Sequence, residues 1–320
     1  MLSRLIARFR IYMLFALVFA VAAAFAPHFL TVGNMVTLLK AASTPAFAAV
    51  GFTLVLVTGQ LDLSFAACMT FAGMVTIGMQ PRHGWLGGLA AALACGFAIG
   101  LVNGLLVTKA KVNSFIVTLG TMIVVSGLVN IYGDGGSLNV NDFRLGDWLD
   151  APSFLAPPIA VAVATVLLFE LLLHRTVWGA NLLLTGGNVK TAWHAGLNTD
   201  RLVIGAFVMS GLLAASGGSL LAMRDSAANP TMGDTSLMPV ITAVIVGGTS
   251  MKGGKGSVVG SAVAVLMLAT ISNGLSARGL GSESQLIVSG LVLAAIVLYD
   301  AFLTNRRELL KGFRADLAGR

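Results

Sequence analysis

The sequence predicts an all-α polytopic membrane protein, with about ten transmembrane helices in a single domain over residues 1–320. Three observations predict this fold class: the composition, a series of long apolar runs, and an unequal distribution of basic residues. The chain is 57% hydrophobic and 10% charged, whereas an ordinary soluble domain carries about 25% charged residues. Nearly all of the length is therefore expected to form membrane spans and their short connections.

Apolar runs close to the length of a membrane-spanning helix, about 20 residues, recur along the chain. They fall at 11–30, 36–58, 63–79, 85–107, 113–131, 154–173, 203–222, 237–250, 256–275 and 284–303. The first run resembles a secretory signal, but Pro27 directly follows the small-residue site and should hinder cleavage, so we expect an uncleaved span. A polar outer loop at 132–153 and a long cytoplasmic loop at 174–202 separate three of the spans.

Basic residues divide unequally between the two sides that these spans define. With a cytoplasmic N-terminus, fifteen of the 20 lie on that side: Arg4, Arg8, Arg10, Lys109, Lys111, Arg175, Lys190, Arg201, Lys252, Lys255, Arg306, Arg307, Lys311, Arg314 and Arg320. The other five lie opposite: Lys40, Arg82, Arg144, Arg224 and Arg278. An excess of Lys and Arg in cytoplasmic loops is typical of polytopic proteins. We therefore expect a multi-pass protein of the bacterial inner membrane with both termini in the cytoplasm.

An acidic residue interrupts the apolar pattern in the segment Gln60-Leu61-Asp62-Leu63-Ser64. The second span stops at Gly59 and the third begins within four residues, which predicts a broken or re-entrant helix that faces protein or a cavity. Two interpretations of Asp62 are compatible with each other. It caps the backbone N–H groups at the start of the third span, or it lines a translocation pathway.

A second break is expected in the short run that ends at Gly247-Gly248-Thr249-Ser250. The segment through Ser257 superficially resembles a phosphate-binding loop. However, Thr249 stands where that motif requires Gly, and Gly256 stands where it requires Ser or Thr. We therefore predict a tight cytoplasmic turn in which Lys252 and Lys255 anchor the topology. No nucleotide site is expected in this chain.

The cytoplasmic loop contains a segment that is suited to docking. Gly186-Gly187-Asn188 predicts a turn whose Asn caps a short helix. Val189, Ala192, Trp193 and Gly196 then follow at i, i+3, i+4 and i+7, which places them on one apolar face. This face either docks a partner protein, or packs back onto its own bundle or lies in the lipid interface.

A faint internal repeat connects the two halves of the chain. Asn103-Gly104-Leu105 recurs as Asn273-Gly274-Leu275, a shift of 170 residues that also places Ser114 on Ser284 and Gly120 on Gly290. The two copies run in opposite directions across the membrane in the predicted topology. Inverted repeats of this kind place a transport pathway at the interface between the repeats.

The sequence indicates no catalytic, metal-binding or cofactor-binding residues. Cys68 and Cys95 lie inside apolar runs, and the four histidines stand alone at span ends, without metal-ligand spacing. No zinc-protease motif or nucleophile elbow occurs. The basic residues are spread over many loops, which favours the lipid surface over nucleic acid as their partner.

Five segments occur in the order found in one known family. They are Gly59-Gln60-Leu61-Asp62-Leu63-Ser64, Ser114-Phe115-Ile116-Val117-Thr118-Leu119-Gly120, Gly186-Gly187-Asn188 with Gly196, Ala243-Val244-Ile245-Val246-Gly247-Gly248-Thr249-Ser250 with Gly253-Gly254-Lys255-Gly256, and Asn273-Gly274-Leu275. Over about residues 30–302 the chain resembles the permease subunits of bacterial ABC importers for monosaccharides, the ribose/xylose/arabinose type.

The resemblance implies a transport subunit that moves a monosaccharide or related small polyol into the cytoplasm. Two permeases, as a homodimer or a heterodimer, would form the pathway between them, and a periplasmic sugar-binding protein would deliver the substrate. A separate cytoplasmic ATPase would hold ATP and Mg²⁺ and dock on the coupling loop. That loop would use Gly186, Gly187, Asn188, Ala192, Trp193 and Gly196. The expected pathway residues are Gln60, Asp62, Ser64, Asn103, Gly247, Gly248, Thr249, Ser250 and Asn273.

One departure from the family pattern concerns the substrate. Leu237-Met238-Pro239 stands where many members carry Glu-Leu-Asp, which points to branches that handle deoxy sugars, sugar alcohols or furanose signalling molecules. Two rival functions remain open: a related ABC permease for branched-chain amino acids or nucleosides, and a self-sufficient secondary transporter. The latter should show paired buried ionisable groups, and Asp62 is the only strong intramembrane acid in the sequence.

Overall fold

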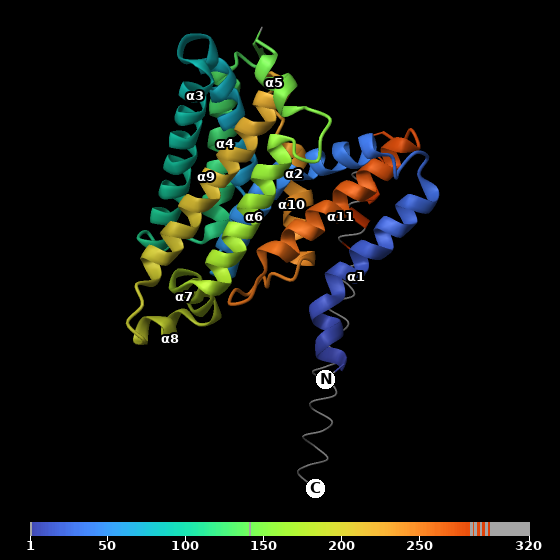
Figure 1. Ribbon diagram of the computed structural model, residues 1–320. Helices are drawn as coiled ribbons and strands as arrows, with labels where there is room; N and C mark the ends of the chain where they lie inside the picture. The colour runs from blue at the N-terminus through green and yellow to red at the C-terminus, as the bar shows by residue number, and fades with distance from the viewer. Residues whose placement is uncertain are drawn as a thin grey trace.

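The computed structural model describes residues 2–140 and 142–281, and beyond these the single residues 284, 287, 288, 290, 291 and 294. Within them the chain is helical apart from two short strands, so the predicted all-α class is confirmed (Figure 1). The predicted span 284–303 lies largely outside the described residues, as do the basic residues after it.

The elements follow one another along the chain in this order: α1 Leu2–Phe25, α2 Val32–Val57, α3 Phe65–Thr108, α4 Ser114–Tyr132, β1 Leu138–Asn139, α5 Arg144–Leu149, α6 Pro157–Arg175, α7 Val177–Gly187, α8 Val189–His194, α9 Thr199–Asp225, β2 Ala227–Ala228, α10 Asp234–Val246 and α11 Val258–Ala277. Six of these helices are long and apolar enough to cross a membrane: α2, α3, α4, α6, α9 and α11. α10 and the Arg10–Phe25 part of α1 are apolar but shorter.

The helix α3 is folded into two arms. Its 44 residues correspond to about 66 Å at 1.5 Å per residue, roughly twice the ~30 Å hydrocarbon core of a bilayer. The helix bends at Gly84, whose φ of 67° is non-helical and suits a residue without a Cβ. The two arms match the separate spans predicted at 63–79 and 85–107.

The segment between α6 and α9 contains more structure than the sequence predicted. The expectation that Gly186 and Gly187 form a turn is wrong, because α7 continues through Gly187 and only Asn188 leaves the helix. The side chain of Thr176 starts α7 by accepting a hydrogen bond from the Gly179 N–H, and Leu182 buries its apolar side. The polar segment at 132–153 likewise contains β1 and α5.

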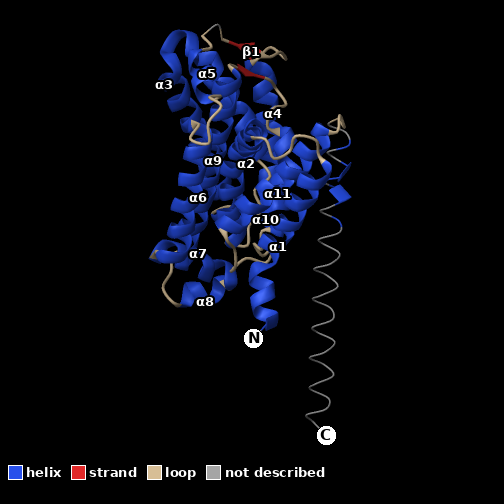
Figure 2. Cartoon of the chain, turned by 45° about the vertical axis from the view of Figure 1, so that its right-hand side comes forward, coloured by secondary structure: helices blue, strands red, loops and turns tan. Residues whose placement is uncertain are grey.

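Contacts between distant loops define two ends of the bundle, which Figures 1 and 2 show at the bottom and the top. At the α8 end, the Lys109 ammonium lies 2.8 Å from the Asp200 carboxylate. At the strand end, β1 pairs with β2 in antiparallel register, and the Lys40 ammonium lies 2.9 Å from the Asp150 carboxylate. The loops that the predicted topology places on one side are thus found together.

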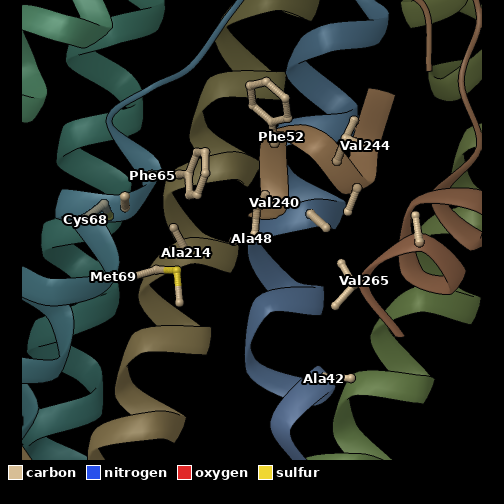
Figure 3. Packing of buried hydrophobic residues seen from close by; sticks show 14 of the residues in the cluster. Ala42, Ala48, Phe52, Phe65, Cys68, Met69, Ala214, Val240, Val244 and Val265 are labelled. Carbon is tan, nitrogen blue, oxygen red and sulfur yellow. The ribbon is translucent and has the colours of Figure 1, made fainter. Parts of the chain in front are cut away.

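The helix α9 packs against both α2 and α3 through small residues. A Cβ on Gly218 would overlap the carbonyl oxygen of Met69 in α3, and one on Gly211 would overlap that of Gly96. Close backbone approach of this kind is the usual packing mode of membrane helices, which gain little hydrophobic energy from association in lipid. Beside this contact, Phe52, Phe65, Val240, Val244 and Val265 join α2, α3, α10 and α11 (Figure 3).

Glu170 has a structural role that the sequence did not reveal. Its Oε2 accepts hydrogen bonds from the backbone N–H groups of Val258 and Val259, at 2.8 and 3.0 Å. These groups begin α11 and have no partner within that helix. A carboxylate from α6 therefore caps the N-terminus of α11, where a negative charge is favoured.

We expect Gly218→Ala to destabilise the protein by about 1–3 kcal/mol, because the added methyl overpacks a backbone contact. Gly205→Ala is the matched control on the same helix, since a Cβ there meets nothing within 4 Å. Ala favours a helix over Gly by about 1 kcal/mol, so the control should match or exceed the wild-type Tm. Thermal unfolding of the detergent-purified protein measures both, and equal Tm values for the two variants would contradict this packing.

Candidate functional site

The surface of α8 is the clearest exposed feature at its end of the bundle. Asn188 caps the helix as predicted, because its Oδ1 accepts the Thr191 N–H at 3.0 Å. Trp193 is 65% exposed, whereas Ala192 is 4% exposed and faces the bundle. Gly196 lies beyond the helix with φ 83°. The predicted single apolar face is therefore divided, since Ala192 anchors α8 and Trp193 projects outward.

A basic groove of about 920 Å³ runs beside Trp193. Lys109, Lys111 and Lys190 line it together with His194 and Asp200. Asp200 neutralises part of this charge, because both Lys109 and Lys111 contact its carboxylate, at 2.8 and 3.4 Å. From the sequence these lysines were counted only among the basic residues expected on the cytoplasmic side, since nothing in their spacing indicated that the α3–α4 connection, α8 and α9 meet here.

Behind α8, three chain segments meet backbone to backbone at what we call the glycine junction: Val57, Gly59, Gly186, Gly253 and Gly254. The Gly254 N–H donates to the Val57 carbonyl at 2.8 Å. A Cβ on Gly186 would overlap that same carbonyl oxygen, and a Cβ on Gly253 would come within 2.9 Å of Gly59 and Gly186 backbone atoms. Gly186, the first of the expected coupling residues, thus touches the end of α2.

Asp62 lies five residues beyond Val57, the last residue of α2, and is almost fully buried, at 2% exposed. Its Oδ1 accepts hydrogen bonds from the Ser64 N–H at 2.9 Å and the Ser64 hydroxyl at 2.6 Å. Its Oδ2 accepts one from the Ser210 hydroxyl at 2.8 Å. The N-cap of α3 is Ser64 and not Asp62 as expected, so Asp62 instead holds the residue at which the helix starts. No basic side chain contacts this carboxylate in the described part of the chain.

The Asp62 network continues through Asn103, which is a predicted pathway residue, and through Thr121, which is not. The Asn103 amide donates to the Ser64 hydroxyl at 2.8 Å, and the Thr121 hydroxyl donates to the Asn103 carbonyl oxygen at 2.6 Å. A chain of buried and partly buried hydrogen bonds therefore joins the α2–α3 connection, the second arm of α3, α4 and α9. Gln60, beside Gly59, is half-buried at the edge of this network.

The predicted break at 247–250 is a tight turn close to the glycine junction. Gly247 packs directly on the backbone of Gly260, and the Ser250 N–H donates to the Lys255 carbonyl at 3.0 Å. Gly248 has φ 98°. The Thr249 hydroxyl is buried without a hydrogen-bond partner among the described residues. These residues lie beside Val57, because a Cβ on Gly256 would contact both Val57 and Thr249.

Asn273 lies apart from the other predicted pathway residues. It exchanges two hydrogen bonds of 2.9 Å with Asn34 at the start of α2. It also lines a cavity of about 450 Å³ between α2, α10 and α11, toward the strand end. The sequence missed the hydroxyl residues of this cavity, which are Thr37, Thr235, Ser236, Ser272 and Ser276. The sequence did contain one signal that could have located this cavity, namely the prolines Pro45 and Pro239 inside two apolar helices.

Comparisons with known proteins identify the family. The family model described as "Branched-chain amino acid transport system / permease component" matches residues 34–297. The L-arabinose ABC transporter permease protein AraH of Azospirillum brasilense is 35% identical over 96% of this chain and 91% of its own length. The ribose import permease protein RbsC of Escherichia coli K12 is 34% identical, over 88% of this chain and 89% of its own length.

A third relative, the ribose import permease protein RbsC of Bacillus subtilis, is 37% identical over 86% of each chain. No solved structure matches this chain significantly. The family model covers well over half of the chain, and several apolar helices are long enough to span a bilayer. The chain therefore belongs to the family of permease components of such transport systems, and it is an integral membrane transport subunit rather than an enzyme.

Proposed function

We propose that this chain is the transmembrane permease of an ABC importer that carries a monosaccharide or related small polyol into the cytoplasm. The names of its relatives, permeases for ribose and L-arabinose, support this substrate class. The single observation that carries the mechanism is the direct contact between Gly186, which precedes α8, and Val57 at the end of α2. A partner that grips α8 would thereby act on the helix that leads to Asp62.

The orientation we propose puts the α8 end in the cytoplasm of a bacterial cell, across the inner membrane. Lys109, Lys111, Lys190, Lys252 and Lys255 all belong to segments at that end. Such an excess of basic residues is typical of cytoplasmic loops. The strand end then faces the periplasm, where a sugar-binding protein would deliver the substrate, and both termini lie in the cytoplasm.

We further propose ten spans arranged as an inverted repeat within one permease domain. The 170-residue shift carries α2 onto α9, the first arm of α3 onto α10, and the second arm onto α11. This agreement of whole helices supports the repeat more strongly than the recurring Asn-Gly-Leu segment alone. The pathway would lie where the two halves meet, and a second permease, identical or related, would complete it.

Energy would enter through a cytoplasmic ATPase seated on Trp193 and the neighbouring basic groove. Movement of α8 would pass through the glycine junction to Gly59 and Gln60, and from there to the Asp62 network. The pathway residues we propose are Gln60, Asp62, Ser64, Asn103, Gly247, Gly248, Thr249, Ser250 and Asn273. Asp62 would act chiefly by fixing α3 and α9 at the break, because its buried carboxylate is occupied by the hydroxyls and N–H group around it.

One alternative rests on a specific observation. The family description names branched-chain amino acids, so a permease for these substrates is the second candidate. Uptake assays with the cognate binding protein, offering ribose, arabinose and leucine, separate the two functions, and uptake of leucine alone would refute the sugar proposal.

Trp193→Glu is expected to weaken copurification of the partner ATPase by about 30-fold or more, since an exposed aromatic anchor often contributes at least 2 kcal/mol to an interface. Trp148→Glu is the matched control: Trp148 lies on α5 at the opposite end and is 60% exposed. Quantitative pull-down from membranes that coexpress both subunits measures the effect. An ATPase that binds Trp193→Glu as well as the control would remove the proposed docking surface.

Gly186→Ala should abolish most sugar uptake while the ATPase still copurifies, because the added methyl forces Val57 away without changing the α8 surface. Gly205→Ala on α9 supplies the control, since a Cβ there meets nothing within 4 Å. Uptake into proteoliposomes and pull-down are measured on the same preparations. If Gly186→Ala transports at the rate of Gly205→Ala, the glycine junction does not transmit the coupling.

A further inference from the structure

The cavity between α2, α10 and α11 is built from small and polar side chains. Its volume of about 450 Å³ falls in the range of ligand pockets, about 300–1,000 Å³. Thr37, Thr235, Ser236, Ser272 and Asn273 bring hydroxyl and amide groups to its wall. Ala41, Val240, Leu268 and Ala269 form apolar surface between them.

Two prolines add backbone acceptors to the same wall. Pro45 lies inside α2 and Pro239 inside α10, and a proline has no N–H to donate to the carbonyl four residues earlier. Those carbonyls belong to Ala41 and Thr235. All four residues line this cavity, so each released carbonyl lies on the helix face that borders it. In lipid such a group needs a partner, and a cavity that holds water or ligand provides one.

The side-chain hydroxyls differ in the hydrogen-bonding capacity that they have left for a ligand. Thr37 donates to the Gly33 carbonyl at 3.0 Å, and Thr235 donates to the Met232 carbonyl at 3.3 Å, so both retain acceptor capacity only. Among the described residues, no hydrogen-bond partner is found for the hydroxyl of Ser236 or of Ser272. These two serines therefore keep both a donor and acceptors for a ligand.

The charge of the wall restricts the class of ligand. None of the residues that line this cavity has an ionisable side chain. The N-terminus of α10 opens here, but its first turn already carries Asp234, which occupies the place of an anion. A zwitterionic amino acid would leave its charges unpaired in a medium of low dielectric. A neutral molecule with several hydroxyls both donates and accepts, which matches the serines and the released carbonyls.

Charged side chains line a neighbouring hollow rather than the cavity itself. A second hollow of about 400 Å³ shares Thr37 and Ala41 with it and is lined further out by Lys40, Asp150 and Arg224. The Lys40 ammonium donates to the Asp150 backbone carbonyl at 2.6 Å and to its carboxylate at 2.9 Å. This pair holds the end of α5 beside the cavity. A hollow lined by charged groups thus adjoins the uncharged, hydroxyl-lined cavity between α2, α10 and α11, which we call the chamber.

We infer that this chamber is a holding site for a neutral polyhydroxylated substrate on its way from the strand end, with Ser236, Ser272 and the carbonyls of Ala41 and Thr235 as its hydrogen-bonding groups. The inference rests on the proposed function, because it assigns a place in this chain to the substrate of that importer. It adds residues that the sequence did not mark and separates sugars from amino acids by the charge of the wall.

The test uses the complete importer in proteoliposomes, with its ATPase and binding protein, and radiolabelled D-ribose and L-arabinose as probes. The variant Ser236→Ala/Ser272→Ala should lower the uptake rate by about tenfold or more, since each lost hydrogen bond to a polar ligand group weakens binding several-fold. Ser216→Ala is the matched control, because Ser216 bonds only within α9, to the Leu212 carbonyl. Ser272→Phe, which fills the chamber, should block uptake, and ATPase copurification should stay normal throughout.

The outcomes distinguish a failure of the holding site from a failure of the proposed transport function. Uptake by both Ser236→Ala/Ser272→Ala and Ser272→Phe that equals the Ser216→Ala rate would overturn the holding site and leave the proposed function standing. If the wild-type importer moves neither ribose nor arabinose but does move leucine, the proposed function fails and the inference falls with it. A selective loss of uptake in the chamber variants, with assembly intact, supports both.

Discussion

Backbone contact at the glycine junction is the constraint on which the rest of this structure depends. The Val57 carbonyl ends α2 and receives its hydrogen bond from Gly254, in a turn nearly two hundred residues later in the chain. Gly186 closes over the same carbonyl with no room for a side chain. Because Val57 is fully buried, separating these segments would leave its carbonyl unpaired and away from water, so the three segments gain stability by staying together. They cannot move independently over more than a small distance.

This constraint mechanically connects three separate features of the molecule. The exposed Trp193 surface lies on one side of the junction, the buried Asp62 network on the other, and the hydroxyl-lined chamber further along α2. The helix α2 connects all three, since it ends at Val57, precedes Asp62 and carries Thr37, Ala41 and Pro45 into the chamber wall. A force applied at α8 would therefore reach the substrate through rigid helices and close backbone contacts, in the manner of a rocking bundle.

Much of the fold could be predicted from the sequence, because span length and apolar composition report directly on membrane crossing. The cap that Asn188 forms on α8 and the bond between Asp62 and Ser64 were also accessible, because each joins residues two or three positions apart. The predictions failed or were silent where long-range contact decides the structure. The Asn34–Asn273 pair joins residues 239 positions apart, the chamber needs three helices to form its wall, and Glu170 caps a helix 88 positions later. α7 was missed because its eleven residues, in a connection between two spans, give too short a periodic signal.

The proposed coupling requires Trp193 to lie on the cytoplasmic side of the membrane, and cysteine labelling determines that side. In a Cys68→Ala/Cys95→Ala background, Trp193→Cys is exposed to a membrane-impermeant maleimide in right-side-out and in inverted vesicles, with Trp148→Cys as the opposite marker. We expect Trp193→Cys to react only in inverted vesicles, and Trp148→Cys only in right-side-out ones. Labelling of Trp193→Cys from the outside would place α8 beyond the reach of any cytoplasmic ATPase and would refute the proposed coupling.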